Sequence, residues 1–300
     1  MKIIVSGSSG LVGAALIDSL RPGGHQIGRL VRSGSASVAD GSKMIRWEPP
    51  TGSMDLAAME GADAVVHLAG ASIAGGRWTA ARKQLLRRSR VDATRHLVAG
   101  FAQLKNKPRV LISASAIGYY GARGDEILTE ASSPGNDFLA QLCRDWETEV
   151  AKAEAQDIRA VMLRFGIILA AQGGALQKML PPFRFGLGGR LGNGRQWMSW
   201  IALEDVVALI RYAIDNDSVR GPVNAVAPNP VRNFEFTSVL AGVLYRPALF
   251  PVPRFALRLM LGEMADALLA SQRVMPASLT EKNFAFRRPE LKSALESILA

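Results

Sequence analysis

The sequence predicts an α/β protein, a doubly wound parallel sheet with a small, mostly helical C-terminal lobe. Short apolar runs alternate with segments of helical spacing as far as residue 228, which is typical of parallel strands joined by helices. A glycine-rich turn joins the first apolar run to the first helical segment. From residue 229 onward, prolines separate amphipathic helical segments.

The first predicted element is a strand at residues 2–5, which leads into a glycine-rich turn. Gly7 permits a tight turn, Gly10 lets the backbone approach a ligand closely, and Gly13 lets the next helix, residues 14–20, pack on the strand. Free N–H groups at the start of that helix attract an anion. Together these elements predict a Rossmann-like cradle for a dinucleotide pyrophosphate, with contacts from Gly7, Ser8, Ser9, Gly10, Leu11, Val12 and Gly13.

Further short apolar runs predict that the parallel sheet continues, because strands buried on both faces are apolar throughout. They lie at residues 26–31, 44–47, 64–68, 109–113, 160–169 and 223–226. Helical spacing at residues 79–101, 138–155 and 203–215 predicts the crossover helices. We therefore expect residues 1–228 to form one nucleotide-binding domain.

A change of composition marks residues 173–195, which are rich in glycine, proline and basic residues. This segment predicts a binding loop over the carboxyl ends of the strands, and we take residues 173–200 as a candidate substrate loop. Residues 229–300 predict a small substrate lobe. Its helices are expected at residues 234–244 and 254–270 and from residue 289.

The net charge of +10 raises the question of a nucleic-acid partner. The densest basic run, residues 82–90, also carries Leu85 and Leu86 in helical register with Val91, which is typical of a helix with a solvated basic face. No aromatic stacking motif accompanies the charge. We therefore expect a small-molecule substrate and no nucleic-acid partner.

Other classes of protein are excluded on simple grounds. No apolar stretch is long enough to span a bilayer and no cleavable leader precedes the first strand, so we expect a cytoplasmic protein. The single cysteine, Cys143, cannot form an internal disulfide, and its apolar neighbours favour a buried packing role. The histidines lack ligand spacing, so no metal site is expected. A homodimer remains open.

The end of the second strand should meet the adenosine ribose of a bound dinucleotide. It carries Arg29, Arg32 and Ser33, where a protein that binds NAD would carry Asp or Glu. Because arginine binds a 2′-phosphate, the sequence favours NADP(H), with Arg32 as the main contact and Ser33 as a second one. The alternative is a solvated arginine at a strand end in a generally basic chain.

Two further turns make a family resemblance specific. His67-Leu68-Ala69-Gly70 closes the fourth strand, and Ser113–Gly121 follows the fifth. With the first glycine turn they resemble the extended short-chain dehydrogenase/reductases, which include nucleotide-sugar epimerases and dehydratases. More of the chain resembles the atypical subfamily labelled "epimerase family protein", which has its own C-terminal domain of unknown function. The segments that carry this likeness are 77–78, 89–91, 164–166, 188–201 and 262–276.

In active members of that superfamily, a Tyr-x-x-x-Lys pair on the helix after the fifth strand transfers the proton while hydride moves to or from nicotinamide. The corresponding helix of this chain has Leu139 and Cys143 at the two positions, or Phe138 and Leu142 in a register shifted by one. The standard acid is therefore missing.

Three polar residues remain as candidates for the catalytic role. The resemblance makes Ser115 the counterpart of the superfamily's catalytic serine. Tyr119 or Tyr120, on the adjacent loop, would reach the substrate. The alternative for both tyrosines is packing beside the cofactor.

The resemblance also implies cofactor and substrate contacts. Those to the cofactor are Leu68, Ala69, Gly70, Arg90, Ser113, Arg164, Gly166 and Ile168. Arg90 stands where the superfamily has an asparagine; we favour a cofactor contact over an anion near the nicotinamide or a surface salt bridge. Donors and aromatic faces in the loop suit an anionic or sugar-like substrate, although a basic surface loop is the alternative. These are Arg190, Arg195, Gln196, Trp197 and Trp200.

The sequence as a whole predicts an NADP(H)-binding oxidoreductase or epimerase of the extended short-chain type. It would act by hydride transfer on a sugar-like or anionic small molecule. The alternative function is a non-catalytic NADP(H)-binding sensor or regulator, which would keep the glycine cradle without the Tyr-x-x-x-Lys pair.

Overall fold

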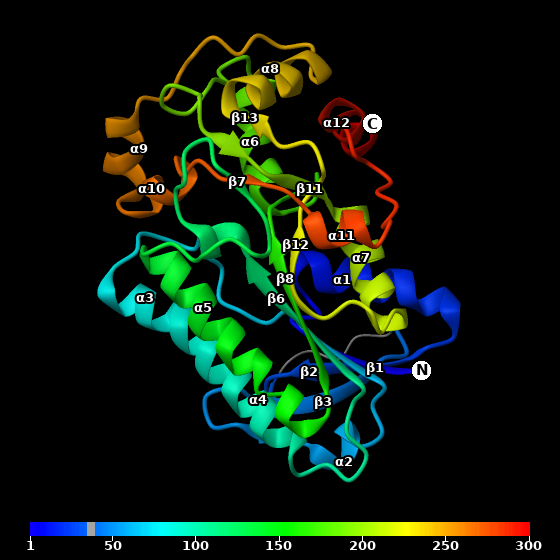
Figure 1. The fold of residues 1–300 in the computed structure, drawn as a ribbon. Coiled ribbons are helices and arrows are strands. Elements are labelled where there is room, and N and C mark those ends of the chain that lie inside the picture. Colours follow the sequence, from blue (N-terminus) through cyan, green and yellow to red (C-terminus); the bar gives the residue numbers. More distant parts are fainter. Residues whose placement is uncertain (35–39) are drawn as a thin grey trace.

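A computed structural model describes residues 1–34 and 40–300, and its centre is an eight-stranded sheet (Figure 1). The strand order is β12-β8-β6-β5-β1-β2-β3-β4, and all neighbours pair in parallel except β3 and β4. The predicted parallel sheet is confirmed. Its strands are β1 (Lys2–Ser6), β2 (Gln26–Val31), β3 (Lys43–Glu48), β4 (Ser53–Met54), β5 (Ala64–His67), β6 (Val110–Ala116), β8 (Arg159–Phe165) and β12 (Gly221–Ala225).

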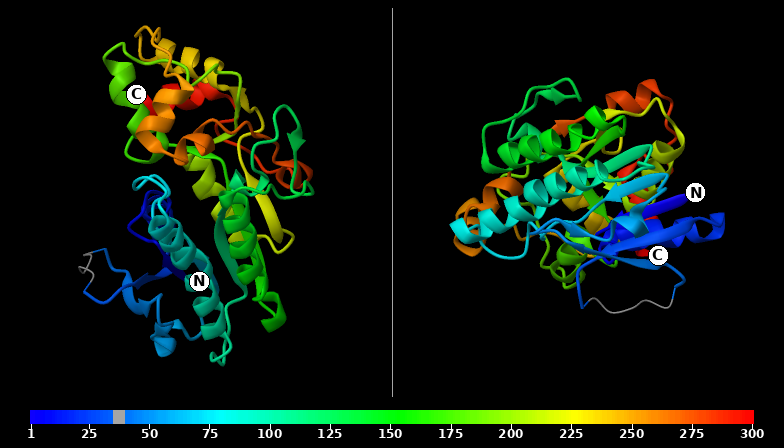
Figure 2. Two further views of the ribbon diagram at one scale, coloured as in Figure 1. Left: turned by 90° about the vertical axis from the view of Figure 1, so that its left-hand side faces the viewer. Right: turned by 90° about the horizontal axis from the view of Figure 1, so that it is seen from below.

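Helices cover both faces of the sheet, because alternate strand residues point to opposite sides. In β1, Ile3 and Val5 pack towards α1 (Leu11–Leu20) and α7 (Leu203–Asp215), whereas Ile4 joins the core on the other face. That other face is covered by α2 (Leu56–Met59), α3 (Ala80–Arg87), α4 (Ala93–Phe101) and α5 (Phe138–Ala151). Figure 2 shows the layers from two further sides, and the doubly wound arrangement is confirmed.

Two predicted elements are interrupted where they approach the carboxyl edge of the sheet. The expected helix at residues 79–101 contains a π-helical turn, η2 (Arg88–Asp92), between α3 and α4. The expected strand at residues 160–169 divides at Gly166 into β8 and β9 (Ile167–Leu169), and β9 pairs with β11 (Trp200–Ala202) outside the main sheet. A Cβ on Gly166 would lie only 2.6 Å from the Ser199 carbonyl oxygen, so this crossing requires glycine.

A third apolar core, apart from the two on the faces of the sheet, joins segments from both sides of residue 228. Leu176, Leu180 and Phe183 of α6 (Gly174–Arg184) pack with Trp200 and with residues of two later helices. Those helices are α8 (Asn233–Val243) and α12 (Leu291–Leu299). The expectation of a loop throughout residues 173–195 was wrong, since the buried residues of α6 are helically spaced and Pro181 and Pro182 occupy only its last turn.

The remaining elements are short. The expected helix at 254–270 breaks at Gly262, whose φ of 62° lies in the left-handed region, and this gives α9 (Arg254–Leu261) and α10 (Met264–Leu268). The others are η1 (Arg21–Gly23), η3 (Ile117–Tyr120), β7 (Ile127–Leu128), η4 (Glu154–Gln156), β10 (Trp197–Met198), β13 (Val231–Arg232), β14 (Arg273–Val274) and α11 (Ala277–Glu281).

A buried histidine connects the core that is covered by α2 to α5 with the turn after β5. His67 is fully buried, with Nδ1 2.7 Å from Ser6 Oγ and Nε2 3.0 Å from Thr94 Oγ1. Trp146 donates from Nε1 to the same Thr94 oxygen at 2.9 Å. Burial, aided by the positive charge of Arg90, lowers the pKa of His67 to about 4. The ring is therefore neutral at physiological pH.

This burial predicts a pH-dependent stability. Between pH 6.5 and about 4 the unfolded chain binds a proton that folded His67 does not, so the free energy of unfolding should fall by up to about 3 kcal/mol as pH drops through this window. Urea unfolding at several pH values measures it. A His67→Gln variant, which has no proton to bind here, should have a shallower pH dependence. Equal pH dependence in both proteins would contradict the assignment.

Candidate functional site

The glycine turn between β1 and α1 has the close contacts that require glycine. Gly7 has a φ of 67°, and a Cβ there would lie 2.7 Å from the Leu68 carbonyl carbon. A Cβ on Gly13 would lie 2.3 Å from the Gly7 carbonyl oxygen. Gly10 is the N-cap of α1 and provides no capping side chain, so the first N–H groups of the helix face outward. The turn therefore fits the pyrophosphate of a dinucleotide.

The two arginines of β2 and its end have different surroundings. Arg29 is buried, donates to the Ser8 carbonyl oxygen at 3.2 Å and to Ser42 Oγ at 2.7 Å, and pairs with Asp40. Arg29 therefore holds the backbone of the glycine turn in place through Ser8. Arg32 is exposed and forms no ion pair within residues 1–34 and 40–300. Next to it, the backbone N–H of Ser33 donates to Glu48 at 2.7 Å.

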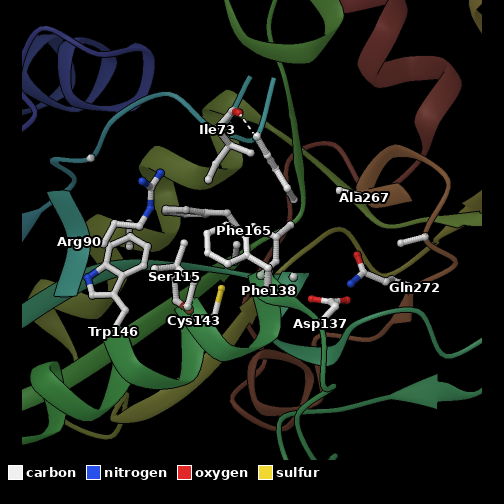
Figure 3. A pocket seen from close by; sticks show the side chains of 18 of the residues that line it. Ile73, Arg90, Ser115, Asp137, Phe138, Cys143, Trp146, Phe165, Ala267 and Gln272 are labelled. Atoms are coloured by element: carbon white, nitrogen blue, oxygen red, sulfur yellow. Dashed lines mark hydrogen bonds between the residues drawn. The ribbon is translucent and has the colours of Figure 1, made fainter. Parts of the chain in front are cut away.

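A cavity of about 610 Å³ lies at the carboxyl edge of the sheet (Figure 3). It is bounded by the turn after β5, the end of β6, the first half of α5 and the region of α10. The expected residues Leu68, Ala69, Gly70, Arg90 and Ser115 line it together, as does Phe165 at the end of β8. The others are Ile73, Trp78, Ala114, Ala116, Gly118, Ala122, Asp137, Phe138, Leu139, Leu142, Cys143, Trp146, Glu263, Asp266, Ala267, Ala270 and Gln272.

Ser115 is anchored by a buried carboxylate that the sequence analysis did not assign a role. Its hydroxyl donates to Glu147 Oε1 at 2.6 Å. Arg164 grips the same carboxylate with two bonds, Nε to Oε1 at 2.9 Å and Nη2 to Oε2 at 2.7 Å. All three side chains are buried. The signal in the sequence was an acidic residue on the otherwise apolar face of α5 that carries Trp146 and Val150.

The same network holds Tyr120. Arg164 Nη1 donates to the Tyr120 hydroxyl at 2.9 Å, and that hydroxyl donates to Asn224 Oδ1 at 2.6 Å. Tyr120 is fully buried, and burial raises its pKa to about 12. Tyr119 stacks on Arg164, with the guanidinium carbon 3.5 Å from the ring centroid. Neither tyrosine lines the cavity, and both contact Arg164.

The helix α5 brings Leu139 and Cys143 to the cavity wall, one turn apart. Cys143 is buried, as expected, and burial raises its thiol pKa to about 12. At neutral pH the thiol therefore keeps its proton and gives the wall an apolar surface.

Several expected contacts do not reach the cavity. Ser113 is fully buried and donates to the Ala114 carbonyl oxygen at 3.1 Å. Arg164 forms an ion pair with Glu147. Gly166 lies between β8 and β9, and Ile168 lies in β9, which pairs with β11.

The expected substrate residues do not line the cavity. Trp200 is fully buried in the third core, with residues of α6, α8 and α12. Gln196 is also buried, and its amide donates to the Leu191 carbonyl oxygen at 3.0 Å. Trp197 is stacked between two arginines of the lobe. Arg190 and Arg195 are exposed. The lobe instead reaches the cavity through residues 263–272, whose contribution periodicity did not indicate.

A parallel sheet with this glycine turn, and a cavity at its carboxyl edge, defines a Rossmann-like dinucleotide-binding fold. Residues 3–225 match the NAD dependent epimerase/dehydratase family, and residues 252–298 match a domain of unknown function, DUF1731. The chain belongs to the NAD dependent epimerase/dehydratase family.

Three relatives illustrate the likeness. Epimerase family protein Mb2239 of Mycobacterium bovis is 43% identical over 294 residues, covering 98% of this chain and 96% of that protein. The chloroplastic SDR39U1 homolog of Arabidopsis thaliana is 38% identical and is covered to 87%, with all of this chain matched. The crystal structure of human epimerase family protein SDR39U1 with NADPH superimposes with a TM-score of 0.90 at 30% identity and 99% coverage of both chains. NADPH is the cofactor that the sequence analysis expects.

Within residues 1–34 and 40–300, no group of three or more His, Cys, Asp or Glu side chains is placed to hold a metal ion. None of the helices in these ranges is long and apolar enough to cross a membrane.

Replacing Arg164 with Met should leave the buried Glu147 carboxylate without its counter-charge. Loss of one partner of a buried ion pair destabilises a protein by roughly 3–5 kcal/mol, and urea unfolding should show a loss of this size. The double variant Arg164→Met/Glu147→Leu removes both charges and should recover most of it. A single variant as stable as the wild type would refute the role of this pair.

Proposed function

We propose that this protein is an NADP(H)-dependent oxidoreductase or epimerase of the extended short-chain type. The observation that carries the proposal is the cavity in which the turn of Leu68 to Gly70 meets Ser115, whose hydroxyl is held by Glu147. The NADPH in the human SDR39U1 structure supports the choice of cofactor. The cytoplasm is its expected location.

The chain's own residues suit the parts of this cofactor. The glycine turn and the start of α1 would hold the pyrophosphate, and Arg32 would pair with the 2′-phosphate. Leu68 and Ala69, which line the cavity, would contact the part of the cofactor that enters it. Bound NADP(H) supplies a two-electron donor or acceptor in the form of hydride transfer.

Ser115 would hold the reacting oxygen of the substrate. Because its proton is directed to Glu147, the lone pairs of Ser115 Oγ are available to accept a hydrogen bond from a substrate hydroxyl. When that hydroxyl is oxidised, its proton passes to Ser115 as the serine proton passes to Glu147; reduction reverses both movements. Glu147 takes the proton at the end of this relay, and Arg164 is a positioning residue that fixes the orientation of its carboxylate.

A second candidate function, an NADP(H) sensor, is favoured by one observation. Leu139 and Cys143, or Phe138 and Leu142 in the register shifted by one, stand where the superfamily has its tyrosine and lysine. All four residues line the cavity, and Cys143 is protonated at neutral pH. A sensor would bind NADPH and convert no substrate.

Arg32→Ala should weaken NADPH binding by about tenfold to a hundredfold, because one charge-assisted hydrogen bond to a phosphate is lost. NADH binding should change little. Fluorescence titration with both nucleotides measures this, and Arg109→Ala, an exposed arginine at the opposite end of the sheet, is the control. Equal losses for NADPH and NADH would remove Arg32 from the phosphate site.

The enzyme proposal is tested by NADPH oxidation with a carbonyl panel and NADP⁺ reduction with the corresponding alcohols. Ser115→Ala should lower kcat by about a hundredfold or more while leaving the NADPH dissociation constant within about threefold. Glu147→Gln should lower kcat more than it raises KM and shift the pH profile. Ser293→Ala, on the exposed face of α12, is the control. Tight NADPH binding with no turnover on the panel would favour the sensor.

A further inference from the structure

The polar hydrogens of the side chains that line the cavity are nearly all donated to other groups of the chain. Ser115 donates to Glu147. Asp137 caps α5 by accepting the Ala140 N–H at 2.9 Å. The Gln272 amide donates to two carbonyl oxygens, of Ile117 and Gly121, at 2.9 and 3.0 Å. The polar hydrogens of Ser115 and Gln272 are therefore used within the chain, and these side chains and Asp137 offer a ligand acceptor oxygens but no further donors.

The two acidic residues from the lobe are also paired. Glu263 forms an ion pair with Lys83, and Asp266 accepts from Arg258 at 2.8 Å. The first pair links the α9–α10 region to α3, and the second links α10 to α9. The charges of both acidic residues are therefore neutralised at the edge of the cavity.

Arg90 is the exception. Its only hydrogen bond is a long one, 3.4 Å to Ser89 Oγ, and it forms no ion pair with any described residue. The guanidinium lies over the Gly70 backbone, where a Cβ would be 3.1 Å from Cζ, and 5.4 Å from the Trp146 ring centroid. Burial lowers its pKa to about 10, so it remains charged at neutral pH. Figure 3 shows Arg90 and Trp146 at one end of the cavity, away from Asp137 and Gln272.

The rest of the wall is largely apolar. It consists of Ile73, Trp78, Phe138, Leu139, Leu142, Trp146 and Phe165 together with small residues. A sugar buried here would lose water from several hydroxyl oxygens and find few side-chain donors to replace it, which is unfavourable. An apolar body with one anionic end would match both the wall and the guanidinium.

We infer that the substrate is a mostly apolar carboxylate whose acid group binds Arg90, and that it is not a sugar nucleotide. Arginine binds carboxylates in a bidentate manner, and the Arg90 guanidinium lies over the Trp146 ring. This inference rests on the proposed function, since it takes the cavity as the place where substrate and cofactor meet.

Calorimetric titration of the NADPH-loaded protein tests the inference. The probes are hexanoate, octanoate and cinnamate, each compared with its primary amide. At least one acid should bind about tenfold or more tightly than its amide. Arg90→Met should abolish that preference, Arg90→Lys should retain part of it, and Arg88→Met, on the exposed side of the same turn, should leave it unchanged.

The NADPH affinity of each variant is measured alongside and should stay within about threefold of wild type. No acid outbinding its amide would overturn the inference. So would an Arg90→Met protein that keeps the acid preference but loses NADPH affinity, because Arg90 would then be a cofactor contact. If Arg90→Met does not fold, Arg90→Gln replaces it. Failure of the wild type to bind NADPH would count against the proposed function, and the acid and amide titrations without NADPH would then judge the inference separately.

Discussion

The buried ion pair between Arg164 and Glu147 determines most of the geometry at the carboxyl edge of the sheet. It ties the end of β8 to the middle of α5, and neither charge has another partner of opposite sign in the buried network. Isolated charges are very unfavourable in such surroundings, so each residue requires the other. The pair fixes the orientation of Ser115 on one side and of Tyr120 and Asn224 on the other.

Because of this pairing, the two arginines of this region, Arg164 and Arg90, differ in whether a carboxylate neutralises their charge. Arg164 is neutralised by Glu147, and that contact raises its pKa further above the usual range, in spite of its burial. Arg90 has no carboxylate, and burial lowers its pKa. The protein thus keeps one cation for structure and leaves another facing an apolar cavity. A site of this kind selects an anion by charge and its remaining substituents by shape.

The sequence predicts the sheet well because its strands are apolar on both faces, and it predicts the glycine turn because Gly7 and Gly13 are sterically required. The structure of residues 173–200 was harder to predict from the sequence. The prolines of α6 concealed a helix, and the directions of Trp197 and Trp200 depend on pairing with β13 and β9, which local periodicity does not encode. Glu147 was visible as a misplaced acid on an apolar helix face, but its partner Arg164 is revealed only by the fold.

A crystal structure of the protein with NADPH tests the central claim most directly. We expect the pyrophosphate at the glycine turn and the nicotinamide ring in the cavity beside Ser115, with Glu147 still bound to Arg164 and the Arg90 guanidinium still open to the remaining space. A nicotinamide ring outside the cavity, or Arg90 bound to the cofactor phosphates, would contradict this arrangement.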